Sequence, residues 1–355
     1  MKKPLQIKIR WLATLWVIVL STAAQAEPTT LVYATPYTPN HTFSRADRTW
    51  MRWVDEHSHG TLRIRAIWSG ALLSSDQSMT ELRHGVADIG LITPIYTRGG
   101  THLLRIQTGF YSGAKTYEQQ VAMYRCLAGA SPEYAKELEG LKVLAVQGGT
   151  LPGLLTRTRK VQSLNDLKGL RLRVPTELLN VLRDLGADPI AMPMGDVYSA
   201  LAKGVLDGVI APPDTLKSLH FGEVAKFFWQ LEVPRGAYPG RAMSEKRWDS
   251  LTNADRTVLE ASIPIWEAAI AKETRDAVQS GMAEGHAQGI DFMPVSPDDQ
   301  RRFNALYEQD AERSARALSR LGIDGESVFV DAHRIGQGIE RTGAVVCHGD
   351  VDAAT

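Results

Sequence analysis

The sequence contains few of the residues that build metal and redox centres. Only two of its 355 residues are cysteines, Cys126 and Cys347, and they form no Cys-x-x-Cys motif. His57 and His59 stand two positions apart, but no carboxylate or cysteine lies at a spacing that completes a metal site. We therefore expect neither a metal nor another cofactor. In an oxidising compartment the two cysteines are able to pair, but the sequence does not show whether their positions allow the bond.

The motifs of common catalytic sites are also absent. The sequence has no His-Glu-x-x-His, no Gly-x-Ser-x-Gly and no Gly-x-x-x-x-Gly-Lys-Ser/Thr run, which are typical of metalloproteases, hydrolases and nucleotide-binding proteins. The Gly336-Gln337-Gly338 run lacks the third glycine and the preceding strand of a dinucleotide-binding turn. These absences predict that the protein is not an enzyme.

After residue 26 the sequence has no apolar run that is a credible membrane span. The N-terminus has the three parts of a signal peptide: four basic residues within the first ten, an apolar run over 11–20, and the small-x-small sequence Ala24-Gln25-Ala26. The apolar run is about half of the ~20 residues that a transmembrane helix needs. We expect residues 1–26 to be cleaved and the protein to be exported to the periplasm; the alternative is an uncleaved membrane anchor.

An excess of positive charge is absent as well. The whole sequence has 40 Lys+Arg and 40 Asp+Glu, and residues 1–26 hold four of the basic residues and no acidic one, so the remaining chain has a net charge of −4. This charge argues against nucleic acid as a partner. The composition, 44% hydrophobic and 23% charged, is that of a globular protein. Because the length exceeds one typical domain, two lobes are expected.

Strand and helix patterns alternate along the chain. Strands are expected at 31–35, 62–68, 89–93, 141–146, 170–174 and 189–192, and helices at 43–57 and 78–84. Strands separated by helices imply a largely parallel sheet. The C-terminal third instead has two long helical stretches at 253–277 and 297–321, and the tail after Thr342 has no sustained periodicity.

The most informative part of the chain runs from Asp166 to Pro213. The expected strand at 170–174 leads into a helical pattern, and Arg173 lies two residues before Pro175 in the turn between them. Ligands bind at the ends of strands in open α/β sheets. The planar guanidinium of arginine suits a carboxylate or a phosphate. We therefore expect Arg173 to contact an anionic group.

Two runs in this part, LKGLRLRVP at 167–175 and MPMGDVYSALAKGVLDG at 192–208, resemble the solute-binding proteins of TRAP transporters, the tripartite ATP-independent periplasmic (DctP) family. The resemblance extends over roughly 30–325. It implies an α/β fold of two lobes, a clamshell with a ligand cleft between the lobes and a long helix, roughly 254–280, that spans both. The chain would cross between the lobes near 147–152 and 234–240.

The resemblance also implies a division of the chain into lobes. Lobe I would comprise 27–150 and about 239–278, and lobe II would comprise 151–238 and about 279–342. We expect residues 343–355 to be a mobile tail unless Cys347 holds them.

In this family the arginine at the position of Arg173 grips the substrate carboxylate, and a phenylalanine often lies against the ligand at the position of Met194. The resemblance therefore implies a carboxylate contact for Arg173 and an apolar contact for Met194, for which core packing is the alternative. Two positions depart from the family. Ala211 replaces a carboxylate-binding asparagine, and Gly153 lies near the place of a second arginine. Together with Pro212, Pro213 and Met194, these changes favour a ligand with one carboxylate and a mostly apolar body, such as an aromatic or branched monocarboxylate.

Further candidates for the cleft lie in loops after strands. Thr93 and Tyr96 follow the strand expected at 89–93, where the hydroxyl can donate a hydrogen bond and the ring can stack on a ligand. His41 follows the first strand and can bond a ligand oxygen or lie at the surface. Thr150 and Tyr238 lie in or beside the expected crossings. Each of these residues has a purely structural role as its alternative.

The resemblance implies a monomeric receptor that passes an organic acid to the integral-membrane subunits of a TRAP permease, driven by an ion gradient. Two other readings remain open at this point. One is a periplasmic receptor with the same architecture that serves an ATP-driven transporter or a sensor kinase. The other is an exported α/β enzyme.

Overall fold

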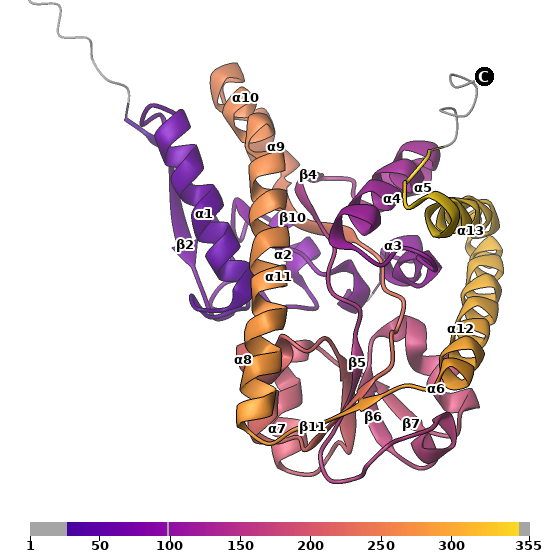
Figure 1. The fold of residues 1–355 in the computed structure, drawn as a ribbon. Coiled ribbons are helices and arrows are strands. Elements are labelled where there is room, and N and C mark those ends of the chain that lie inside the picture. Colours follow the sequence, from indigo (N-terminus) through magenta and orange to yellow (C-terminus); the bar gives the residue numbers. More distant parts are fainter. Residues whose placement is uncertain (1–26, 98, 348–355) are drawn as a thin grey trace, which may run out of the picture.

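The computed structural model describes residues 27–97 and 99–347, which form two α/β lobes, each built around one sheet (Figure 1). The first sheet has the order β2-β1-β3-β10-β4, with β1 Thr29–Ala34, β2 Leu62–Ile67, β3 Ile89–Leu91, β4 Leu141–Gln147 and β10 Tyr238–Ser244. The second has the order β11-β9-β5-β8-β6-β7, with β5 Gly153–Thr156, β6 Arg171–Val174, β7 Asp188–Ala191, β8 Gly208–Ala211, β9 Phe227–Gln230 and β11 Asp291–Pro294. The expected signal peptide and residues 348–355 of the expected tail lie outside the described residues.

Helices pack against both sheets. The longer ones are α1 Thr42–His57, α4 Tyr117–Ala130, α10 Asn253–Ala261, α11 Ile263–Ala287, α12 Pro297–Ala317 and α13 Gly325–Thr342. The shorter ones are α2 Ser78–Arg83, α3 Leu103–Ile106, α5 Pro132–Glu137, α6 Leu179–Asp184, α7 Val197–Ala202, α8 Thr215–Ser218 and α9 Glu245–Asp249. Helix α11 contacts α1 and β4 of the first lobe and α8 of the second, so it spans both lobes (Figure 1). The two-lobed α/β architecture is confirmed.

The expectation of a largely parallel sheet is wrong for the strands next to the lobe crossings. β1 runs parallel to β2 and β3, and β6 runs parallel to β7 and β8. In contrast, β10 is antiparallel to β3 and β4, and β5 is antiparallel to β8 and β9. The chain crosses between the sheets in the segments 148–152 and 231–237. A strand that enters its sheet from the other lobe starts at the cleft, so it is antiparallel to neighbouring strands whose C-terminal ends lie at the cleft.

The second sheet is buried on both faces, because side chains alternate between the faces along each strand and apolar side chains occupy both. Leu154 of β5 and Ile210 of β8 belong to one apolar cluster, and their neighbours Leu155 and Val209 belong to the cluster on the opposite face. This alternation decides which residues at the ends of the strands face the cleft.

The C-terminal helices differ from the expected ones. The helix expected at 253–277 is two helices, because α10 ends at Ala261 and Pro264 lies in the first turn of α11, where its missing amide is tolerated. Helix α11 then continues to Ala287 because its last part packs on α8 of the second lobe. The helix expected at 297–321 ends at Ala317 and is followed by a 3-10 turn.

Helix α13 was not anticipated, and its residues were assigned above to lobe II. The structure places its buried residues in the core of the first lobe instead: Val328, Phe329, Ala332, Ile335 and Ile339. The helix lies beside α4 (Figure 1). A disulfide between Cys347 and Cys126 of α4, with 5.2 Å between the Cα atoms, closes a separation of 221 residues. The described part of the tail is therefore held on the first lobe.

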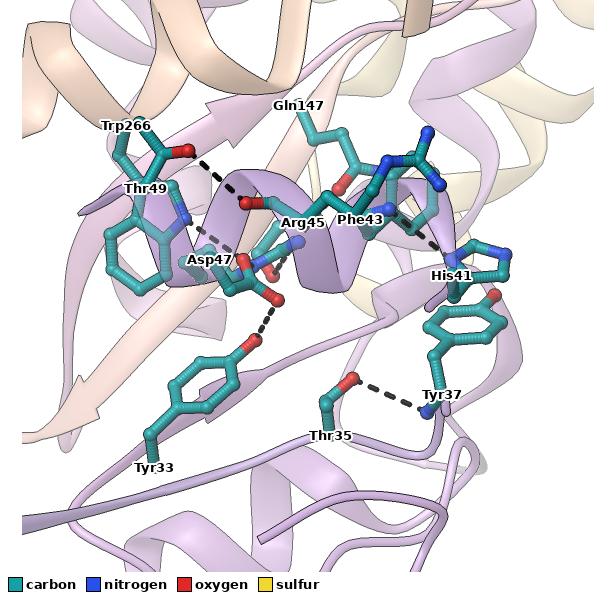
Figure 2. A network of polar contacts seen from close by, with 12 residues as sticks. Tyr33, Thr35, Tyr37, His41, Phe43, Arg45, Asp47, Thr49, Gln147 and Trp266 are labelled. Atoms are coloured by element: carbon teal, nitrogen blue, oxygen red, sulfur yellow. Dashed lines mark hydrogen bonds and ion pairs between the residues drawn. The ribbon is translucent and has the colours of Figure 1, made fainter. Parts of the chain in front are cut away.

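The first lobe contains a fully buried ion pair between Asp47 of α1 and Arg241 of β10. Both side chains are 0% exposed, and 2.8 Å separates Nε of the arginine from Oδ1 of the aspartate. The same carboxylate accepts hydrogen bonds from the hydroxyl of Tyr33 on β1 and from Nε1 of Trp266 on α11 (Figure 2). The pair therefore joins the sheet, the first helix and the long helix.

The network continues from Arg241 towards the cleft. Nη1 of Arg241 donates to Oε1 of Gln147 at 2.8 Å, and the amide nitrogen of Gln147 donates to the hydroxyl of Tyr238, also at 2.8 Å. Each partner comes from a strand that borders a crossing segment. These bonds fix the cleft wall of the first lobe relative to α11.

We predict that Asp47→Asn destabilises the protein by about 3–5 kcal/mol, because it leaves the charge of Arg241 buried without an anion. Urea unfolding followed by circular dichroism measures the loss. The control is Asp276→Asn, which breaks an exposed i,i+4 pair with Lys272 on α11 and should change little. Unfolding of Asp47→Asn at the same urea concentration as the parent protein would contradict the prediction.

Candidate functional site

Two adjoining cavities, of about 70 and 80 Å³, lie between the lobes. They share residues that come from the first lobe, the second lobe and a crossing segment: Ile95, Tyr96, Met194, Pro212, Arg235 and Tyr238. Because the cavities have these walls in common, we describe them as one cleft.

Arg173, at the end of β6, is the most buried cation of this cleft, with 2% of its surface exposed. Its Nε donates to the carbonyl oxygen of Met192 at 2.9 Å, and its Nη2 donates to the hydroxyl of Tyr96 at 2.6 Å. Its Nη1 has only a 3.4 Å contact with the carbonyl oxygen of Ile210. Neutral oxygens therefore hold the guanidinium, and among the described residues no carboxylate lies within 4 Å of it.

Arg171, two residues earlier on the same strand, has a different environment. It is exposed and forms an ion pair with Asp188 of β7, with 2.8 Å between Nε and Oδ2. Period-2 alternation puts both arginines on one face of β6 and does not separate them. The separation arises because the end of β6 meets the first lobe, where Tyr96 covers Arg173.

His41 lies at the mouth of the second cavity and is uncharged. Burial, with help from the nearby Arg45 and Arg241, lowers the pKa of its imidazole to about 3. Its Nδ1 accepts from the amide of Phe43 at 3.2 Å and caps α1, and its ring stacks on Tyr37 with 3.9 Å between the centroids (Figure 2). In the neutral ring the proton then lies on Nε2, which makes that atom a hydrogen-bond donor.

The structure brings most of the other expected residues into the same cleft. Met194, Tyr96 and Tyr238 line both cavities, and Thr93 and Thr150 line the second. The hydroxyl of Thr93 is already used, because it donates to the carbonyl oxygen of Ser75.

Ala211 and Pro213 do not line either cavity, contrary to the expectation. Ala211 is the last residue of β8, is 0% exposed, and belongs to an apolar cluster on one face of the second sheet. Pro213 is also buried. Pro212, between them, lines both cavities. Because successive residues point to opposite sides, the residue that faces the cleft is Pro212, which the sequence analysis used as an argument for an apolar ligand but did not include among the contact residues.

Several cleft residues were not anticipated from the sequence. Arg235 lies in a crossing segment, Glu177 follows Pro175 in the turn after β6, and Asp214 follows Pro213. Tyr37 lies in a stretch that resembles an ordinary turn. The sequence does show a charged residue beside each expected turn or crossing, and this could have indicated a cleft residue. Such residues are usually exposed to solvent, however, so the pattern is weak.

Two carboxyl groups in the cleft have raised pKa values. Burial raises the pKa of Asp214 to about 6, and the charge of Arg235 opposes the rise. Burial also raises the pKa of Glu177, opposed by hydrogen bonds with its own backbone amide and with the hydroxyl of Thr108 and then by the charges of Arg235 and Arg173. Together, two arginines and two carboxyl groups give the cleft a balanced set of charges beneath largely apolar walls.

A two-lobed α/β protein with a charged cleft at the lobe crossings has the architecture of a bacterial solute-binding receptor. The family described as bacterial extracellular solute-binding protein, family 7, matches residues 33–317. The chain belongs to this family, as its resemblance to the TRAP solute-binding proteins predicted.

Relatives of known fold and function support this assignment. The C4-dicarboxylate-binding periplasmic protein of Rhodobacter capsulatus is 24% identical over 320 residues, 85% of this chain and 92% of that protein. Five other curated relatives are matched over only 45–68% of their own length.

Solved structures share the fold at low identity. A TRAP solute-binding protein from Rhodoferax ferrireducens with copurified benzoate has a TM-score of 0.80 and 20% identity, covering 89% of this chain and 100% of that one. One from Bordetella bronchiseptica with bound (R)- and (S)-mandelate has a TM-score of 0.76 and 17% identity, covering 88% and 100%.

The family and these neighbours are solute-binding proteins rather than enzymes, as predicted. The alternative membrane partners, an ATP-driven transporter or a sensor kinase, are not favoured by these matches. Within residues 27–97 and 99–347, no helix is long and apolar enough to cross a membrane, and no three acidic, histidine or cysteine side chains are grouped to hold a metal.

We predict that Asp214 makes the stability of the unliganded protein depend on pH. Its pKa is about 6 in the folded protein and 3.8 in an ordinary environment, so the folded state holds more protons between these values and the unfolding free energy falls as pH rises through them. Asp214→Asn removes this dependence. The melting temperature of Asp214→Asn minus that of the parent protein should therefore be larger at pH 8 than at pH 4.

The matched control is Asp249→Asn, which removes an exposed carboxylate. Its difference from the parent protein should be similar at both pH values. A difference for Asp214→Asn that is the same at pH 4 and pH 8 would show that this carboxyl group titrates normally.

Proposed function

We propose that the protein is an extracytoplasmic receptor that binds an organic acid, holds the carboxylate with Arg173, and delivers the acid to a TRAP-type permease driven by an ion gradient. The burial of Arg173 without an anionic partner supports this proposal most. A buried charge is costly unless an opposite charge compensates it. The carboxylate of a ligand supplies that charge.

The geometry of the guanidinium suits this role. Its Nη1 is only weakly engaged, because a 3.4 Å contact is at the limit of a hydrogen bond. A carboxylate can therefore take Nη1 and Nη2 as paired donors. Hydrogen bonds to charged groups contribute about 1.5–3 kcal/mol each.

The walls of the cleft favour a ligand with an apolar body. Ile95, Met194 and Pro212 line both cavities, and the rings of Tyr37 and Phe43 line the second. The structural neighbours that hold benzoate and mandelate carry aromatic carboxylates. Aromatic and branched monocarboxylates are therefore the proposed ligands, with His41, Thr150 and Tyr238 as further contacts.

The proposed location is the periplasm, reached after cleavage of residues 1–26. The signal-peptide pattern of the N-terminus and the extracellular family support it. The proposed receptor is a monomer, and each protein chain lines a complete cleft. The proposed lobes are those of the two sheets, with α13 on the first lobe.

We predict that Arg173→Lys weakens binding of the cognate acid more than tenfold, or about 1.4 kcal/mol. Lysine keeps the charge but loses the two parallel donors. Isothermal calorimetry measures the change. Arg171→Lys is the matched control, because it changes an exposed arginine on the same strand. Unchanged affinity in Arg173→Lys would remove Arg173 from the site.

We also predict that the ligand closes the two lobes. In the structure the lobes touch where Tyr96 accepts from Arg173 and where the hydroxyl of Thr176 donates to the carbonyl oxygen of Ile95 at 3.2 Å. A ligand that contacts both walls binds the closed form better and shifts the balance towards it. Small-angle X-ray scattering should give a smaller radius of gyration with saturating ligand. Identical curves would indicate a rigid cleft.

A further inference from the structure

The cavity that contains Arg173 holds a second group of polar side chains. Arg235, from the crossing between β9 and β10, and Glu177, from the turn after β6, both line it. Neither is needed to grip a simple monocarboxylate, which Arg173 can hold alone. Because both are charged and line a largely apolar cleft, we expect them to contact a further polar group of the ligand.

Arg235 is held in the cleft without a partner of its own. It is half-buried, and it makes no hydrogen bond or ion pair with any residue in the described part of the chain. Its guanidinium packs on Gly149 in the other crossing segment, where an added Cβ would lie 2.6 Å from Nη1. The absence of a side chain at Gly149 therefore makes room for this cation.

Gly153 lies near the place of the family's second arginine, but the structure has no room for a side chain there. A Cβ there would lie 2.7 Å from the ring of Phe228 and 2.7 Å from the carbonyl oxygen of Trp229. The second cation of the cleft thus comes from a different segment, at Arg235.

Glu177 has an unused acceptor. Its Oε2 is buried and makes no hydrogen bond of normal distance and angle with any described residue. The hydroxyl of Thr108, which also makes none, lies near this carboxyl group and lowers its pKa. A buried carboxylate oxygen without a donor is costly. The charges of Arg235 and Arg173 act on this carboxyl group, but neither arginine lies within 4 Å of it as an ion pair. A donor on a bound ligand satisfies this oxygen.

We propose that Glu177 and Arg235 form a second polar subsite, which selects carboxylate ligands that carry a hydroxyl or ammonium donor on the carbon next to the carboxylate. The proposal rests on the function proposed above. The ligand carboxylate lies between Arg173 and Arg235, and the donor on the neighbouring carbon points to Oε2 of Glu177. The apolar remainder lies against Ile95, Met194 and Pro212.

The charges of the cleft support this class over a dicarboxylate. Arg173 and Arg235 are balanced by Glu177 and Asp214 when all four are ionised. A second ligand carboxylate would lie near Glu177 and be repelled by it. A hydroxyl adds no charge, and an ammonium group adds a charge opposite to that of Glu177.

The test uses sets of three acids that differ only at the carbon next to the carboxylate. One set is phenylacetate, mandelate and phenylglycine, and another is 3-methylbutanoate, 2-hydroxy-3-methylbutanoate and valine. Calorimetry with the complete mature protein gives the affinity ratio within each set. We expect the hydroxy or amino acid to bind at least about tenfold more tightly than the unsubstituted acid, as a hydrogen bond to a charged group implies.

Three variants assign the preference to the subsite. Glu177→Met keeps the length of the side chain and removes both oxygens, so the ratio should fall to about one. Glu177→Gln keeps an acceptor but no charge, so a preference for the hydroxyl should survive and a preference for the ammonium group should not. Arg235→Gln should weaken every acid. Glu232→Met, which removes an exposed carboxylate in the same crossing segment, should leave all ratios unchanged.

The outcomes separate this inference from the function on which it rests. If Arg173→Lys weakens all acids but Glu177→Met leaves the ratios of the parent protein, the subsite is overturned and the receptor function stands. If the parent protein binds all three acids of each set equally well, the subsite is likewise overturned and the receptor function stands. If no acid binds, or if Arg173→Lys changes none of the affinities, the proposed function falls and the subsite falls with it.

Discussion

The arrangement of this protein depends on the contrast between two buried arginines. Arg241 is 0% exposed and is paired with Asp47, so its charge is compensated within the fold. Arg173 is 2% exposed and is held by neutral oxygens alone. A buried cation needs an anion. The first arginine therefore stabilises the fold, and the second is the one for which we propose that the carboxylate of a ligand supplies the anion.

The two arginines also differ in what they connect. Arg241 joins β10 to α1 directly and to α11 through the carboxylate that Trp266 also contacts, and the chain from Gln147 to Tyr238 carries this order to the cleft wall. These contacts tie the cleft wall of the first lobe to α1 and α11. Arg173 belongs to the second lobe and meets the first mainly at Tyr96. A carboxylate bound as proposed would contact Arg173 beside one of the places where the two lobes touch.

Much of this was accessible from the sequence, and the limits have physical causes. The strands around Arg173, the first helix and the two-lobed fold follow from local patterns and from the motif at 167–208. The antiparallel strands β5 and β10 did not, because direction depends on where the chain enters a sheet. Arg235 and Glu177 were missed because each is charged and stands in an irregular segment, where solvent exposure is the usual state. Ala211 and Pro213 were expected as contact residues in place of Pro212 because one residue of register decides which side chain faces the cleft.

The way in which Arg173 is held separates the grip on the carboxylate from the choice of ligand. Its contacts at Nε and Nη1 are backbone oxygens of Met192 and Ile210, and its only side-chain hydrogen bond among the described residues is the one to Tyr96, so its position depends largely on the fold of the second sheet. The other acidic and basic side chains that line the cleft come from turns and crossings: His41, Glu177, Asp214 and Arg235. Substitutions at these four positions can change which ligand body the cleft accepts, without disturbing the strand that presents Arg173. In the proposed function, the grip on the carboxylate and the selection of the ligand therefore lie on different parts of the chain.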